Sequence, residues 1–118
     1  MMMNKRRMSE ASYIERQICI EICNGNIKIK LPSIRVMAKI FNVNHNTISK
    51  VYDELKKKKL TYSVKGKGTY ITENIEVKEL VKKEMTESIV KAYIDNMKQM
   101  NYKSDQIIAL VDKCIRSE

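Results

Sequence analysis

The stretch that decides the fold is residues 31–55, which read LPSIRVMAKIFNVNHNTISKVYDEL. Ser33 stands where a helix takes its N-cap, and apolar residues within positions 36–41 then recur on one helical face. A second apolar face, within positions 48–55, follows a short link at residues 42–44. Two short helices joined by a link of about three residues form a helix-turn-helix.

Asparagines mark both ends of this link. Asn42 takes the position at which the turn needs a positive φ, which asparagine tolerates better than most residues. Asn44 is placed either to cap the second helix or to contact a base, and capping is the better supported of the two. The face of the second helix that lies opposite its apolar residues is polar and available to a partner. It comprises His45, Asn46, Ser49 and Lys50.

The residues upstream predict a further helix and an extended segment. Ser12 and Glu15 have the spacing of a capping box, and isoleucines at every fourth position then follow until Asn24–Gly25. Residues 27–31 alternate apolar residues with lysines, as in a short strand or an extended link.

The residues downstream predict a β-hairpin. Segments 61–65 and 69–72 are rich in β-branched and aromatic residues, and Gly-Lys-Gly lies between them. A hairpin after the second helix makes the arrangement a winged helix-turn-helix. The expected fold class is therefore mainly α with a small β-hairpin wing, and the winged domain is expected to span residues 1–74.

The remaining residues, 75–118, predict two amphipathic helices. Asn101 is expected to end the first, and Ser104 to cap the second. A helix pair of this size is marginal alone, so we expect it to dimerise with a second copy; folding back onto its own winged domain is the alternative. The residues predicted for this dimerisation region are Val77, Leu80, Val81, Met85, Ile89, Tyr93, Ile107, Val111 and Cys114.

The charge is unevenly distributed between these two parts. Residues 1–74 hold 15 Lys/Arg and 6 Asp/Glu, whereas residues 75–118 hold 8 of each. All of the net charge of +9 therefore lies in the winged part. Such an asymmetry favours an anionic partner for that part, with a solvated lysine-rich surface as the plainer interpretation.

Other features limit the class of protein. No apolar run has the length of a membrane span, and residues 1–8 have no apolar stretch behind them, so we expect neither membrane insertion nor a signal peptide. Three cysteines are too few for a disulfide framework, which favours the cytoplasm. Cys19 and Cys23 are expected to pack in the core, with redox sensing as the alternative. No pattern of catalytic, cofactor-binding or metal-ligating residues is present, so we expect no enzyme activity, cofactor or metal.

Three strings occur in order along the chain: LPSIR at 31–35, NHNTI at 44–48 and KGKGT at 65–69. Together they resemble the GntR family of bacterial transcription regulators. The opening of the second string and the short two-helix tail resemble the YtrA-type subfamily. The resemblance covers residues 11–118 and implies a homodimer that binds an inverted-repeat operator in double-stranded DNA.

The resemblance also implies which residues contact DNA. They lie at the starts of the two helices of the helix-turn-helix and at the tip of the wing: Ser33, Arg35, Asn44, His45, Asn46, Thr47, Ser49, Lys50, Lys65, Gly66 and Lys67. Three positions depart from the family pattern. His45 stands where relatives usually carry Arg or Pro, Ser49 where many carry Arg, and Lys59 where Gly is common.

By this resemblance the expected function is a repressor that controls a neighbouring transporter operon and is released by an effector. Two other functions are consistent with the same features. A non-specific, architectural DNA-binding protein would use the positive charge without reading bases, and a winged-helix module could instead bind another protein.

Overall fold

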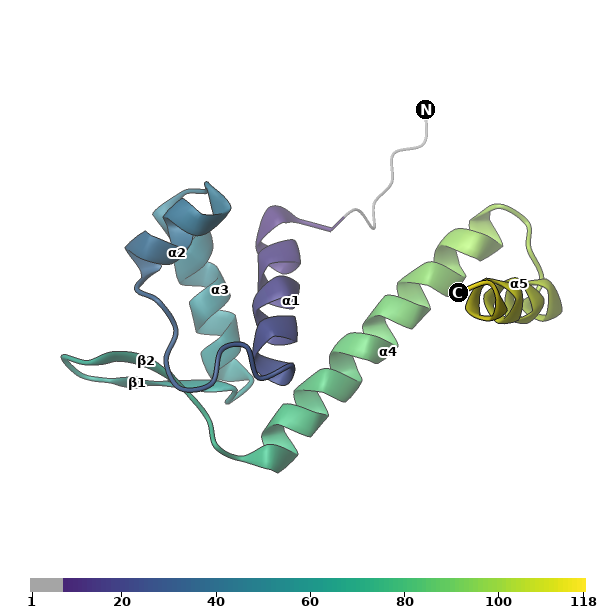
Figure 1. Cartoon of the computed structure of the whole chain (residues 1–118). Coiled ribbons are helices and arrows are strands. Elements are labelled where there is room, and N and C mark those ends of the chain that lie inside the picture. The colour runs from purple at the N-terminus through teal and green to yellow at the C-terminus, as the bar shows by residue number, and fades with distance from the viewer. Residues whose placement is uncertain (1–7) are drawn as a thin grey trace. The chain divides into compact units, whose positions relative to one another are not determined.

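The computed structural model describes residues 8–118 as five helices and one two-stranded antiparallel hairpin (Figure 1). The chain divides into two compact units between Met85 and Thr86. We call the described part of the first unit, residues 8–85, the head, and residues 86–118 the tail. The observed elements agree with the expected class, mainly helical with a hairpin wing. Residues 1–7 of the expected winged domain lie outside the described residues.

Helix α1 (Glu10–Cys23) begins earlier than predicted. Its N-cap is Ser9, whose hydroxyl accepts a hydrogen bond from the Ser12 amide at 3.1 Å. The prediction that Ser12 caps this helix is therefore wrong, because Ser12 already lies in the first turn. The predicted end is confirmed, since Asn24 is the C-cap and Gly25 adopts a φ of 77°.

Helix α2 (Ile34–Phe41) is capped as predicted. The Ser33 hydroxyl accepts a hydrogen bond from the Val36 amide at 3.2 Å. The helix ends at Asn42, which adopts the predicted left-handed conformation with φ 54°. This residue turns the chain directly toward the next helix.

Helix α3 (His45–Lys57) is also capped as predicted. The Asn44 Oδ1 atom accepts a hydrogen bond from the Asn46 amide at 2.7 Å. One face of α3 is fully buried in the head and carries Ile48, Val51, Tyr52 and Leu55. The helix is thereby held by its apolar side, and its polar side faces outward.

The wing consists of strands β1 (Thr61–Val64) and β2 (Gly68–Ile71). Their register pairs Tyr62 with Tyr70. The segment at residues 27–31 is an extended link rather than a named strand, and its Lys30 forms an isolated antiparallel bridge with Tyr70. The link therefore borders β2 on the edge that β1 leaves open.

Helices α1, α2 and α3 and strand β2 contribute to one hydrophobic core, and helix α4 (Ile75–Gln99) contributes its first turns. Asn74 caps α4 through hydrogen bonds from the amides of Glu76 and Val77. The buried members of the core are Ile14, Ile18, Cys19, Ile22, Leu31, Met37, Ala38, Ile48, Val51, Tyr52, Leu55, Leu60, Ile71 and Val81.

Three residues that were predicted to mediate dimerisation lie in this core or pack against it. Val81 is only 4% exposed, and Val77 and Met85 pack against the same cluster. Their apolar faces meet the core of their own chain, which is why the compact head extends past residue 74 to Met85.

In the tail, α4 ends before Asn101, which has a φ of 67°, and α5 (Ser104–Arg116) follows. The prediction that Ser104 caps α5 is wrong, because Ser104 is its first helical residue. The N-cap position is Lys103, whose amide donates to the Gln106 side chain at 2.8 Å. Within residues 8–118, no helix carries an apolar stretch of membrane-spanning length.

Candidate nucleic-acid interface

The start of α2 presents a cation and no competing acid. Arg35 is the second residue of the helix and is exposed, and the first turn contains no acidic side chain. The Ser33 hydroxyl is occupied by capping the Val36 amide. Free amides at a helix start carry partial positive charge, so a guanidinium beside them suits a phosphate group.

The start of α3 presents the polar face that the sequence predicted. His45, Asn46 and Lys50 are exposed, whereas Thr47 and Ser49 are half-buried. The Asn44 side-chain Oδ1 atom accepts the capping hydrogen bond, which supports the first of its two predicted roles. Side chains of this kind are the ones that read base edges when a helix start enters the major groove of DNA.

A hydrogen bond joins α3 to the segment that immediately precedes α2. The Tyr52 hydroxyl, in the middle of α3, donates to the Pro32 carbonyl oxygen at 2.7 Å. Burial raises the pKa of Tyr52 to about 12, so the phenol stays protonated and remains a donor at neutral pH. The start of α2 is thereby fixed relative to α3.

The tip of the wing is a tight turn with two exposed lysines, Lys65 and Lys67. The Lys67 amide donates to the Val64 carbonyl at 2.9 Å, and Gly66 between the lysines has a φ of 77°. Apart from Gly66 and its two neighbours in the chain, no atom of residues 8–118 lies within 4 Å of the place where a Cβ of Gly66 would stand. The backbone at the tip is therefore open to close approach by a partner.

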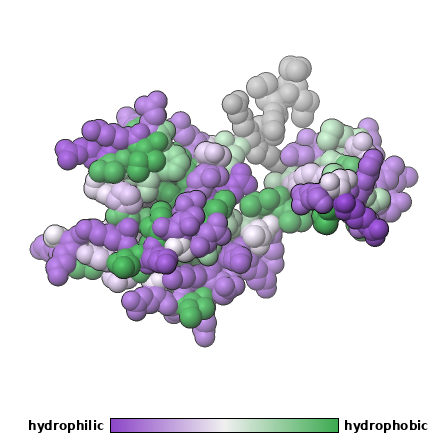
Figure 2. Space-filling view, viewed as in Figure 1, coloured by the Kyte–Doolittle hydropathy of each residue, from purple (hydrophilic) through white to green (hydrophobic). Residues whose placement is uncertain are grey.

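The cations of this surface are available to an anion. Arg35, Lys50, Lys65 and Lys67 form no ion pair with any carboxylate of residues 8–118. The structure places all of the predicted DNA-contacting residues in the head, on the starts of α2 and α3 and on the wing tip. Hydrophilic residues cover most of the head's visible face in Figure 2, with hydrophobic patches among them.

Of the residues predicted for dimerisation, some are exposed in the structure and others are buried. Leu80 of the head is exposed, as are Ile89, Tyr93, Val111 and Cys114 of the tail. Ile107 is buried within the tail. Further exposed apolar side chains of the tail are not among the residues predicted for dimerisation: Val90, Met100, Tyr102, Ile108 and Ile115.

Of the two cysteines of α1, Cys19 is buried in the core as predicted, whereas Cys23 is half-buried and is not part of the core cluster. Burial raises the pKa of the Cys19 thiol to about 11, and burial also raises the pKa of Cys23. Both thiols are therefore protonated at neutral pH. A protonated thiol is a poor nucleophile and a poor metal ligand. Within residues 8–118, no three His, Cys, Asp or Glu side chains gather as a metal site would require.

The sequence matches known regulators over the part that builds this geometry. The family model described as bacterial regulatory proteins, gntR family, matches residues 11–71. YhcF of Bacillus subtilis (strain 168), an uncharacterized HTH-type transcriptional regulator, is 30% identical over 79 residues, which are 67% of this chain and 65% of YhcF. The HTH-type transcriptional repressor YtrA of the same organism is 49% identical over 45 residues, which are 38% of this chain and 35% of YtrA. The chain thus spans less than two thirds of either relative.

Solved structures share the fold. A GntR family transcriptional regulator from Listeria monocytogenes superposes with a TM-score of 0.75 at 28% identity, over 93% of this chain and 98% of its own. The DBD of AraR, in complex with operator ORX1, superposes with a TM-score of 0.55 at 26% identity, over 59% of this chain and 87% of its own. These likenesses confirm the winged helix-turn-helix, and the family model covers more than half of the sequence. The chain belongs to the GntR family of bacterial regulatory proteins.

Proposed function

We propose that this chain is a homodimeric transcription repressor that binds an inverted-repeat operator in double-stranded DNA. The observation that carries the proposal is the geometry of α3. Its apolar face is locked in the core, and its first turn presents exposed His45 and Asn46 beside the exposed Arg35 of α2. The AraR domain, which superposes on 59% of this chain, is bound to an operator in its own structure.

Each part of the interface has a distinct role in this proposal. The start of α3 enters the major groove, where Asn46 pairs with adenine and Lys50 donates to guanine. Arg35 and the lysines of the wing tip grip phosphates, which sets the position of the head on the duplex. The positive charge carried by residues 1–74 steers the head toward DNA.

The tail supports the homodimer. It is a unit of two helix segments, and its buried large apolar residues are Met97 and Ile107. Its exposed apolar residues outnumber these, and Ile108 is as much as 70% exposed. A segment below about 40 residues rarely buries enough surface to be stable alone, and an identical tail offers a matching apolar face.

Similarity to the repressor YtrA supports repression rather than activation. A dimer that occupies a promoter blocks transcription from it. The family resemblance extends the proposal to a neighbouring transporter operon as the target, and to an effector that releases the dimer from DNA. Such a repressor acts in the cytoplasm.

Footprinting on the promoter of the protein's own gene tests the proposal. We expect a protected dyad, and competition with scrambled DNA should show a preference of about 10³-fold or more for that site. Equal affinity for scrambled DNA would instead favour an architectural protein. Weak binding that hardly depends on salt would favour a protein-interaction module.

Substitution of Arg35 tests the docking geometry within the same assay. Arg35→Ala should weaken operator binding and leave the dimer intact, because Arg35 lies on the exposed start of α2. Lys39→Ala is the matched control, since Lys39 is exposed in the last turn of the same helix. Equal binding by both variants would contradict the proposed orientation of the head.

A further inference from the structure

Lys30 lies outside the predicted interface, yet the structure attaches it to the wing. Its backbone forms a bridge with Tyr70, and two hydrogen bonds of 2.9 Å flank this bridge. One runs from the Leu31 amide to the Thr69 carbonyl, and the other runs from the Ile71 amide to the Ile29 carbonyl. The position of the Lys30 backbone beside β2 is therefore fixed.

The side chain of Lys30 runs along the wing rather than away from it. Its Nζ atom lies 5.6 Å from the centroid of the Tyr70 ring, within the range of a cation–π interaction. Its Cε atom lies 2.8 Å from the place where a Cβ of Gly68 would stand. Gly68, which has a φ of 120°, thus leaves the space that the lysine stem occupies.

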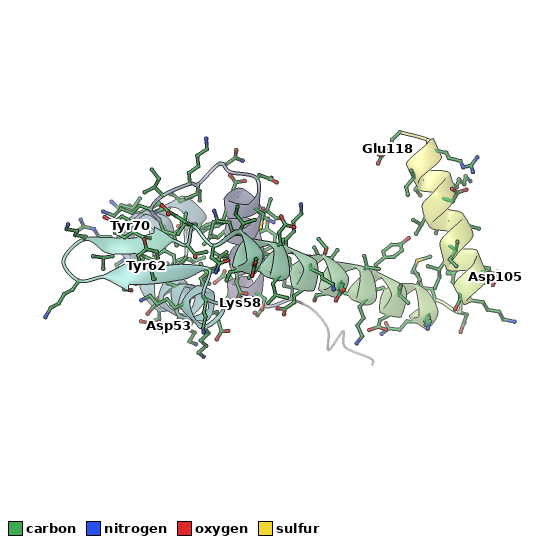
Figure 3. The ribbon with its side chains drawn as sticks, turned by 90° about the horizontal axis from the view of Figure 1, so that it is seen from below. Asp53, Lys58, Tyr62, Tyr70, Asp105 and Glu118 are labelled. Atoms are coloured by element: carbon green, nitrogen blue, oxygen red, sulfur yellow. The ribbon has the colours of Figure 1, made fainter. Side chains whose placement is uncertain are left out.

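The ammonium group of Lys30 lies on the solvent-facing side of the wing. Tyr70 stacks on Tyr62, with ring centroids 6.0 Å apart and an interplanar angle of 24°. The two tyrosines are labelled together on the wing in Figure 3. Their neighbours Thr61 and Ile71 are buried against the core, whereas Tyr62 is 48% exposed, so the tyrosines and Lys30 share the face turned to solvent.

We propose that Lys30 is a further phosphate-binding residue of the DNA interface, acting beside the wing-tip lysines Lys65 and Lys67. Two features support this role. The contacts with Tyr70 and Gly68 hold the stem of Lys30 in advance, which lowers the conformational entropy that an exposed lysine loses on binding. Lys30 is exposed and forms no ion pair with a carboxylate of residues 8–118, so its ammonium is available to DNA.

Lys28 provides a matched control. It belongs to the same link, is exposed and carries the same charge. Its Cε atom lies 3.9 Å from the place of a Gly25 Cβ, at the turn that follows α1. Removing the charge of Lys28 therefore changes the net charge by the same amount as removing that of Lys30, but it leaves the wing unaltered.

The proposal rests on the proposed DNA-binding function, and a salt titration tests it. Binding of the full chain to a labelled mixed-sequence duplex is measured by fluorescence anisotropy at several salt concentrations. Lys30→Met keeps the stem and removes the charge, so the log–log slope should become shallower by about 0.9 for each bound head, which is the loss of one phosphate contact per head. At about 0.1 M salt this corresponds to roughly eightfold weaker binding for each head in contact with DNA.

Lys28→Met should keep the wild-type slope, and Lys30→Arg should restore it, because arginine keeps the charge and also stacks on tyrosine. An unchanged slope for Lys30→Met, or an equal change for Lys28→Met, would overturn the role of Lys30. If Lys30→Met does not fold, Lys30→Gln carries the same expectation. Failure of the proposed function is distinguishable: a chain that does not bind DNA shows no salt-dependent binding even as the wild type, and a chain that binds without sequence preference is identified by the competition with scrambled DNA.

Discussion

The Tyr52 hydroxyl donates a hydrogen bond of 2.7 Å to the Pro32 carbonyl oxygen, across twenty residues of sequence. Pro32 immediately precedes the Ser33 cap of α2, and Tyr52 lies within α3. The bond therefore couples the placement of Arg35 at the start of α2 to the helix proposed to read bases. A single buried phenol thus helps to set the geometry of the two helix starts in the interface.

Removal of this bond should destabilise the head. Tyr52→Phe keeps the buried ring and leaves the Pro32 carbonyl without its partner, so the free energy of unfolding should fall by about 1–2 kcal/mol. Urea denaturation followed by circular dichroism measures the change. Tyr62→Phe is the control, since the Tyr62 side chain is exposed and should change stability by less than about 0.5 kcal/mol. Equal stability of the two variants would show that the Tyr52 bond contributes nothing.

The same phenol predicts a loss of stability at alkaline pH. Burial raises the pKa of Tyr52 to about 12 in the folded protein, whereas an unfolded tyrosine titrates near pH 10. The folded state therefore retains this proton longer. Its contribution to stability is complete below about pH 10 and is lost as the pH rises toward 12.

Urea denaturation at a series of alkaline pH values measures this loss. The wild-type free energy of unfolding should decline through this range, and Tyr52→Phe should decline less steeply. The Cys19 thiol, whose pKa burial raises to about 11, contributes a decline of the same sign to both proteins. Parallel declines would exclude a role for Tyr52.

Sequence alone predicted the features that depend on a few neighbouring residues. Caps at Ser33 and Asn44 and the left-handed turn at Asn42 follow from local sterics and from short side chains with a free oxygen. The cap of α1 was misplaced because Ser9 and Ser12 are both competent, and the choice depends on where the helix can begin.

Features that depend on distant residues were not predictable in the same way. The apolar spacing of Val77, Val81 and Met85 showed a buried face but not which surface buries it, and the structure assigns it to the core of the head. The relation of Lys30 to Tyr70 spans forty residues and follows only from strand register. The alternation of lysines at residues 27–31 was the one signal for it.

Base reading by α3 makes a specific prediction for Asn46. Its side chain is exposed in the first turn, so Asn46→Ala should preserve the fold and relax the preference at one base position by about 1–3 kcal/mol. Affinities for operators that carry each single base change measure this effect. Uniform weakening across all of these operators would assign Asn46 to a phosphate rather than to a base.

The end of α3 contains a strained residue that a substitution should relieve. Lys59 follows the C-cap Lys58 and has a φ of 62°, a conformation that costs side-chain-bearing residues about 1–2 kcal/mol. Lys59→Gly should therefore raise the free energy of unfolding by about 1 kcal/mol. Lys56→Gly, inside the helix, should lower it by about as much. A decrease for both variants would show that Lys59 makes a compensating contact.

The proposed dimer depends on the apolar surface of the tail, and Ile89 tests it. This side chain is 38% exposed on the part of α4 that belongs to the tail. Ile89→Glu places a charge in the proposed interface, where its burial without a partner would cost several kcal/mol. We expect light scattering to show twice the 13.8 kDa chain mass for the wild type and a single chain mass for the variant. Ser88→Glu is the control, because it adds the same charge at an exposed polar position next to Ile89. If Ile89→Glu keeps the wild-type mass, this face of α4 does not join the two copies.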